Sequence, residues 1–317
     1  MKEIGGYIEL EHNNMPMLHD GAIALNCGTN CLAYLIRARK IEKLVIPYYL
    51  CDCIQNVCHR EGTEVRKYKI NKDFTPVTDL VLNDDEWLYV VNYYGQLTHM
   101  QIQNLAQRYT RIIIDQAQAY FEMPVAGVDT LYTCRKFFGV PDGAFLYTDT
   151  AINEELPQDE SFGRMRFLLG RYERTASEFY SEYAANNFLL SNEPIKKMSR
   201  LTNNLLHGID YNRVKHIRTS NYQYFHNQLR ASNQLDLKAI EGAFAYPLLV
   251  DNGAELRKKL IQKKIYVPTL WPNVLAETAE ESIEYYYTAN ILPLPLDQRY
   301  SVEDLKIIVD IVTKNNY

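Results

Sequence analysis

The chain of 317 residues has no long apolar run and no excess of positive charge. No stretch approaches the roughly 20 consecutive apolar residues of a membrane-spanning helix. The start, MKEIGGYIELEH, lacks the basic and apolar regions of a secretory signal peptide. The formal net charge of −5 and the pI near 5.9 argue against a nucleic-acid partner. We therefore expect a cytoplasmic protein that binds neither membrane nor nucleic acid.

Cysteine is also scarce, with six residues in the whole chain. Six cysteines in a chain of this length do not make a disulfide scaffold, and cytosolic thiols are normally reduced. Cys51, Cys53, Cys58 and His59 could be written as a zinc cluster, but they lack the usual Cys-x-x-Cys spacing. Buried thiols and no bound metal are the favoured interpretation.

What the chain does have is an alternation of short apolar runs with helical segments over its first two thirds. This pattern is typical of an α/β protein with a mainly parallel, helix-covered sheet. The length favours one large and one smaller domain. We predict a large domain at residues 1–235, with an N-terminal arm at 1–20, and a small C-terminal domain at 236–317.

A carboxylate and a lysine follow two of the predicted strands. Residues 112–114 are all isoleucine, so Asp115 falls at the carboxyl end of a buried strand, where open α/β sheets bind ligands. Lys136 follows 21 residues later (136 − 115), before a turn at 141–143. Such a pair suits pyridoxal phosphate (PLP), because a lysine amine forms a Schiff base with its aldehyde and a carboxylate keeps its ring nitrogen protonated. The alternatives are a helix N-cap for Asp115 and a solvated amine for Lys136.

Two further strand ends carry residues suited to a cofactor. Gly28, Thr29 and Asn30 form a small-residue turn where a helix begins, and free N–H groups at such a point favour a phosphate. Any strand-turn-helix junction also favours these residue types. Tyr48 and Tyr49 follow the strand that Pro47 ends, and they could equally be packing residues.

Taken in order, these motifs resemble a known family. Cys-Gly-Thr-Asn at 27–30, Asp-x-Ala-Gln at 115–118 and the downstream Lys136 are similar to the DegT/DnrJ/EryC1/StrS group of fold-type-I, PLP-dependent sugar aminotransferases. The similarity runs from GGYIELE near the start to LPLPLDQRYSVEDL near the end. It implies a large domain with a mainly parallel, seven-stranded type of sheet, a small C-terminal α+β domain, PLP as cofactor and a homodimer.

The resemblance also implies roles for single residues. Lys136 is the Schiff-base residue and moves the proton during the reaction, with Asp115 at the ring nitrogen and Gln118 beside the ring hydroxyl. The remaining cofactor contacts that it implies are Gly28, Thr29, Asn30 and Thr133 at the phosphate and Tyr49 on the ring face, with Tyr48 as the alternative.

The chain departs from the family pattern around the lysine. Leu131 stands where many members have a serine, and Gly143 is the one glycine at the end of GVPDGA where members have a pair. These differences leave the phosphate contacts open. Arg135 could serve an anionic group or face outward.

The substrates implied by the resemblance are glutamate, as amino donor, and a keto-sugar nucleotide, in cell-surface polysaccharide or secondary-metabolite sugar biosynthesis. The dehydratase branch of the family replaces the lysine by histidine, and Lys136 argues against it. The alternative is a catalytically silent member that binds PLP or a sugar in a structural or regulatory role.

The C-terminal third carries further expectations. Apolar and aromatic residues at helical spacing predict one long helix over 196–229, strands at 244–250 and 265–271, and a final helix opened by Ser301. By resemblance, Asn203 or Asn204 reaches the site of the other subunit. Trp271 lines the substrate cleft or is buried.

Overall fold

The structure is a computed structural model that describes residues 4–314. Its core is a seven-stranded sheet with strand order β1-β7-β6-β5-β4-β2-β3. All neighbours are parallel except β7, which runs antiparallel to both β6 and β1. The strands are β1 (Ile23–Leu25), β2 (Lys43–Pro47), β3 (Glu64–Tyr68), β4 (Glu86–Val91), β5 (Ile112–Asp115), β6 (Asp129–Thr133) and β7 (Ala144–Tyr147).

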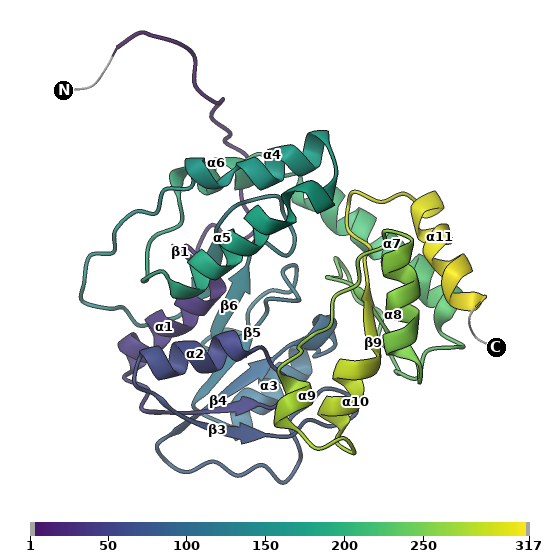
Figure 1. Ribbon diagram of the computed structural model, residues 1–317. Coiled ribbons are helices and arrows are strands. Elements are labelled where there is room, and N and C mark those ends of the chain that lie inside the picture. The colour runs from purple at the N-terminus through teal and green to yellow at the C-terminus, as the bar shows by residue number, and fades with distance from the viewer. Residues whose placement is uncertain (1–3, 315–317) are drawn as a thin grey trace.

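Helices cover this sheet, and α1 and α2 lie side by side across it (Figure 1). Every residue of β5 is buried, because helices on both faces leave a parallel strand no face in water. The helices that accompany the sheet are α1 (Gly28–Arg39), α2 (Asp52–Arg60), α3 (His99–Arg108), α4 (Arg166–Glu173), α5 (Tyr180–Asn192) and α6 (Arg200–Leu206). Short 3-10 turns lie at Tyr93–Gly95, Phe162–Arg164 and Ala176–Phe179.

The C-terminal part contains a two-stranded antiparallel sheet. This sheet pairs β8 (Tyr246–Leu249) with β9 (Ile291–Leu294). The long helix α7 (Tyr211–Leu229) packs against α11 (Val302–Thr313) and β8, and Figure 1 shows α7 beside α11. The other helices here are α8 (Gly253–Gln262), α9 (Val274–Glu277) and α10 (Ile283–Asn290).

The fold class predicted from the sequence is therefore confirmed, whereas some elements differ. The helix expected over 196–229 is two helices, because the chain turns at Gly208 between α6 and α7. Residues 265–271 form no strand, and the partner of β8 is β9 instead. Ser301 does open the final helix, in a capping box with Asp304.

The expectation of reduced cysteines is wrong for one pair and confirmed for the other four. Cys51 and Cys53 are joined by a disulfide, where reduced thiols were expected. Cys27, Cys31, Cys58 and Cys134 are free and buried, and no group of His, Cys, Asp or Glu within residues 4–314 could hold a metal ion. No helix in that range is long and apolar enough to cross a bilayer.

A buried histidine anchors the N-terminal segment to the sheet. His19 is fully buried among the rings of Tyr120, Tyr132 and Tyr147. Its Nε2 lies 2.9 Å from the carbonyl oxygen of Tyr120, and its Nδ1 lies 3.0 Å from the hydroxyl of Tyr147. Burial lowers the pKa of His19 to about 4, although the Tyr120 carbonyl opposes the shift.

This depressed pKa predicts a loss of stability in mild acid. Between pH 6.5 and about 4 the unfolded chain takes up a proton at His19 that the folded protein excludes. The free energy of unfolding should therefore fall as the pH is lowered. His19 should contribute about 2 kcal/mol of this loss between pH 7.5 and pH 5. Urea unfolding of the wild type and of His19→Gln at both pH values measures this. A matched change at the exposed His216, His216→Gln, should keep the wild-type dependence, and an equal dependence in His19→Gln would contradict the assignment.

Candidate functional site

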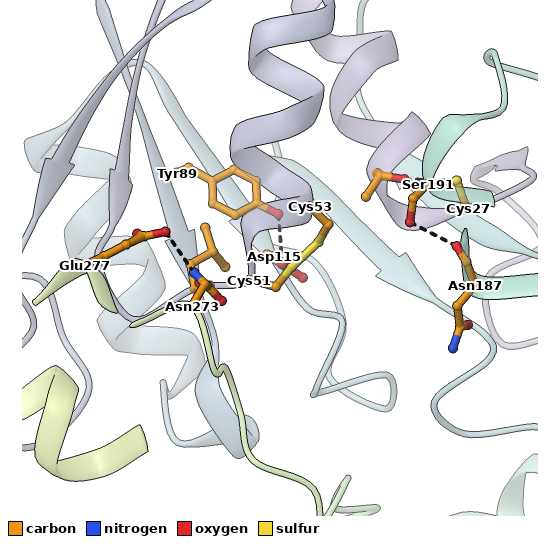
Figure 2. Close-up of a disulfide and its surroundings, with 11 residues drawn as sticks. Cys27, Cys51, Cys53, Tyr89, Asp115, Asn187, Ser191, Asn273 and Glu277 are labelled. Atoms are coloured by element: carbon orange, nitrogen blue, oxygen red, sulfur yellow. Dashed lines mark hydrogen bonds between the residues drawn. A yellow bond between two sulfur atoms is a disulfide. The ribbon is translucent and has the colours of Figure 1, made fainter. Parts of the chain in front are cut away.

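Asp115 is the last residue of β5 and lies at the carboxyl edge of the sheet, as its position in the sequence predicts. The Tyr89 hydroxyl donates to its Oδ2 at 2.8 Å, and the Ala117 N–H donates to its Oδ1 at 2.7 Å. Figure 2 shows the first of these bonds, with the Cys51–Cys53 disulfide nearby at the start of α2. The two donors hold the carboxylate in one orientation.

Lys136 lies in the connection between β6 and β7, and its side chain reaches solvent. Its Nζ lies 5.7 Å from the centre of the Phe244 ring. Within residues 4–314 the amine has no hydrogen bond and no ion pair, unlike Lys43 or Lys67, which pair with carboxylates. An accessible amine without a partner is free to bond a ligand.

The charges of Asp115 and Lys136 influence one another. Burial raises the pKa of the Asp115 carboxyl, while the Lys136 charge and the two donors lower it. Burial lowers the pKa of the Lys136 amine, Asp115 raises it and Arg135 lowers it further. The net effect keeps part of the amine neutral at a lower pH than for a free lysine, and the neutral amine is the nucleophile.

The turn at 28–30 forms the N-terminus of α1, as predicted. Cys27 is its N-cap residue, and the N–H groups of Gly28 and Thr29 have no acceptor within the part of the chain described. A Cβ on Gly28 would lie 3.7 Å from the Cβ of Thr133, so the start of α1 and the end of β6 are in contact. Thr29 and Thr133 thus lie near the same group of free donors. This arrangement fits a phosphate.

Two residues predicted to contact the cofactor use their side chains for hydrogen bonds within the protein. The Asn30 amide is fully buried, donates to carbonyl oxygens of Glu193 and Pro194, and accepts from Arg60. Asn30 therefore has no side-chain donor left for a phosphate, and its N–H donates to Cys27 at 3.1 Å. Gln118 is buried, and its Oε1 accepts from the Tyr94 N–H at 2.9 Å.

The tyrosine pair divides between core and surface. Tyr49 is fully buried, with its ring 5.1 Å from Trp271 and 5.2 Å from Tyr93 between centres. Its ring offers no free face, so stacking on a cofactor stays a prediction that requires Tyr49 to be uncovered. Tyr48 is half-buried and lies under the amine of Lys67. Trp271 is half-buried against the same aromatic cluster.

The turn after Lys136 is fixed by a buried carboxylate. Asp142 accepts from the N–H of Ser199 at 2.8 Å, from its hydroxyl at 2.7 Å, and from the Thr202 hydroxyl. Gly143 has φ +111°, and a Cβ there would lie 2.9 Å from the Thr202 methyl carbon. The single glycine of this turn is thus required by both backbone angle and space.

Three further residues at the site were not predicted. Tyr89, the donor to Asp115, lies on β4 two residues before its end. Arg218 of α7 is fully buried and donates to the Phe137 carbonyl at 3.2 Å, and Gln298 donates to the same oxygen at 2.8 Å. Burial lowers the pKa of Arg218 to about 10, so it stays charged at neutral pH. A lone arginine on an apolar helix face was the signal in the sequence.

The candidates for a contact with a second subunit lie on α6. Asn204 accepts from the Asn13 N–H at 2.9 Å and donates to the Glu11 carbonyl at 2.9 Å, so it holds the N-terminal arm. Asn203 is half-buried. Neither placement tests a role in another subunit, which stays a prediction.

Two hollows lie elsewhere on the molecule, of about 290 and 580 Å³. Neither is lined by Asp115 or Lys136. In the smaller one, Asp159 pairs with Arg164 at 2.6 Å and lies 3.6 Å from Lys196. The charges there satisfy one another, which leaves the edge at Lys136 as the candidate site.

Comparison with known proteins agrees with the fold. No family model matches the chain, and no curated protein matches it. A DegT/DnrJ/EryC1/StrS aminotransferase from Brucella abortus is 15% identical with a TM-score of 0.62, over 93% of this chain and 86% of that one. The putative sugar aminotransferase Spr1654 from Streptococcus pneumoniae, in its PLP form, is 14% identical with a TM-score of 0.65, over 94% of this chain and 89% of that one. DesI in the presence of its TDP-sugar product is 13% identical with a TM-score of 0.63, over 92% of this chain and 79% of that one. The chain has the fold of these proteins.

The electrostatic link between Asp115 and Lys136 predicts a shift in amine reactivity. Because an ionised Asp115 raises the pKa of Lys136, Asp115→Asn should move the pH at which Lys136 becomes reactive to a lower value. Labelling with an amine reagent across a pH series, read by peptide mass spectrometry, measures that midpoint. The exposed Lys258 in the same digest is the internal reference. A midpoint that stays or rises in the variant would show that the carboxylate does not act on the amine.

Proposed function

We propose that this protein is a PLP-dependent aminotransferase that transfers an amino group from glutamate to a keto-sugar nucleotide. The observation that carries the proposal is an accessible, unpaired Lys136 beside a buried Asp115 at the carboxyl edge of the sheet. The solved structures of the same fold include a sugar aminotransferase in its PLP form, which supports the cofactor.

The residues present fit that cofactor. Bound PLP supplies an electron sink for the carbon that gains or loses the amino group. Lys136 offers its amine to the cofactor aldehyde and afterwards moves the proton at the reacting carbon. Asp115, held by Tyr89 and Ala117, would accept from a protonated ring nitrogen. Gly28, Thr29 and Thr133 would donate to the phosphate, and Gln118 would lie beside the ring.

The sugar class of the substrate has weaker support than the cofactor. DesI, of the same fold, was solved with its TDP-sugar product. The 25 tyrosines of this chain include Tyr48, which is half-buried at the sheet edge, and aromatic rings with hydroxyls are suited to packing against a sugar and a base. We place the reaction in the cytoplasm, in cell-surface polysaccharide or secondary-metabolite sugar biosynthesis.

We further propose that the protein works as a homodimer. The first part of the arm exposes apolar side chains, with Tyr7 98% and Ile8 89% accessible, and it extends away from the body in Figure 1. Around α4 and α5, Phe162, Tyr172 and Phe188 are also exposed. A second copy would remove this apolar surface from water, and a twofold dimer is the commonest closed assembly.

Removing the lysine amine tests the cofactor assignment. The wild type mixed with PLP should gain the visible absorbance of lysine-bound PLP, and borohydride should fix the label on Lys136. Lys136→Ala should show neither the band nor activity, because no other amine takes that place. Lys258→Ala, at an exposed lysine, is the control and should behave as the wild type. A label found on another lysine would contradict the assignment.

The same preparation distinguishes the proposed activity from a silent binding role. Glutamate should convert the loaded protein to its amino form and remove the visible band. Adding 3-keto- or 4-keto-nucleotide sugars separately should then restore the band with one class. A band that glutamate never changes would favour the catalytically silent alternative. Recovery with simple keto acids alone would contradict the sugar substrate.

The dimer predicts a mass in solution of about twice 36.9 kDa. Light scattering after gel filtration measures it. Tyr172→Glu and Phe188→Glu place charges on the exposed apolar surface of α4 and α5 and should shift the protein toward the monomer. Val81→Glu changes an equally exposed apolar residue in a different loop and should leave the dimer intact. A fully active wild-type monomer would contradict the proposal.

A further inference from the structure

Arg135, next to Lys136, carries a positive charge that no carboxylate of the described chain neutralises by an ion pair. Its guanidinium is half-buried, and its Nη2 donates to the side-chain oxygen of Asn187 on α5. Other half-buried arginines differ: Arg39 pairs with Asp129 at 2.8 Å, and Arg164 pairs with Asp159 at 2.6 Å. Arg135 therefore does not face outward, and its charge is left for another group.

The contacts of α5 bring this guanidinium to the start of α1. Asn187 lies less than one helical turn before Leu190, whose carbonyl accepts from the Cys27 thiol at 3.4 Å. Figure 2 shows Cys27 and Asn187 together in the same view. Cys27 is the N-cap of α1, and Gly28 contacts Thr133, which precedes Arg135 by two residues. Both sets of contacts therefore indicate that Arg135 lies close to the free N–H groups at the start of α1.

The physical chemistry of this corner favours an anion. Burial lowers the pKa of Arg135, yet a guanidinium stays protonated in proteins. A partly buried cation without a counter-charge is costly, and a helix N-terminus adds further positive potential. Asp142 is one source of negative charge that acts on Arg135, but its oxygens are taken by Ser199 and Thr202.

We propose that Arg135 is the cationic ligand of the cofactor phosphate, together with the N–H groups of Gly28 and Thr29 and the hydroxyl of Thr133. The arginine would take the part of the serine that this chain lacks, because Leu131 is a buried apolar residue of β6. The inference rests on the proposed function, since it assigns a residue to the cofactor of that same site.

Two ligands that differ only in the phosphate test it. The protein is freed of cofactor and titrated with PLP and with pyridoxal, following the visible band. In Arg135→Gln the dissociation constant for PLP should rise by about tenfold or more, because a charge-assisted hydrogen bond is lost. The constant for pyridoxal should stay within about twofold of the wild type. Arg135→Lys keeps the charge but loses the planar guanidinium. Its dissociation constant for PLP should lie between those of the wild type and Arg135→Gln.

Arg213→Gln removes the same charge from the exposed face of α7 and should bind both ligands as the wild type does. Circular dichroism and the melting temperature show whether each variant is folded. If Arg135→Gln does not fold, Arg135→Lys decides by the same PLP to pyridoxal ratio. An unchanged PLP constant would overturn the proposal. An equal loss for both ligands would also overturn it, because Arg135 would then act on the ring or on the fold.

A wild type that gives no band with either ligand would mean that the proposed function has failed. The role of Arg135 as an anion ligand would then be tested with inorganic phosphate. At matched ionic strength, phosphate should raise the melting temperature of the wild type and not that of Arg135→Gln. Equal stabilisation of both proteins by phosphate would overturn the anion site itself. The two failures are thus distinguishable.

Discussion

The electrostatic coupling of the buried Asp115 to the accessible amine of Lys136 is the interaction on which the site depends. Burial raises the pKa of Asp115 and lowers that of Lys136, and the charge of each group opposes the shift of the other. The sheet produces this balance, because parallel strands end together and set the end of β5 beside the connection that follows β6. A carboxylate and an amine that would be ordinary in water thereby become a reactive pair.

Distant parts of the chain hold this pair in place. Arg218 donates to the Phe137 carbonyl and to the carbonyl of Ala243, and so it ties the lysine segment to the chain before β8. On the other side Asp142 ties the same segment to the start of α6. Both ties are buried, so breaking either leaves buried polar groups without a hydrogen-bond partner, at a cost of about 1–3 kcal/mol for each group. The position of Lys136 is thus set from both sides of the molecule.

The sequence predicted those features that depend on local pattern. Apolar runs located β2, which Pro47 ends, and β5, whose last residue is Asp115 at the ligand edge. The side-chain partners could not be predicted in this way, because they lie far away in the chain. Asn30 turns to a loop more than 160 residues later, and Tyr49 is covered by Trp271. The prediction of a strand at 265–271 was wrong for the same reason, because β8 pairs with β9, which lies further along the chain.

The segment that carries Lys136 is closed at both ends by the sheet. Thr133 pairs with Ala144 across β6 and β7, and the Cys134 N–H donates to the Gly143 carbonyl at 3.0 Å. The hairpin therefore has a fixed length between two anchored strands. A residue inserted into or deleted from 134–143 would have to bulge the loop or shift the register of two strands at once. Variation in this segment should consequently proceed by exchange of side chains, with its length kept constant.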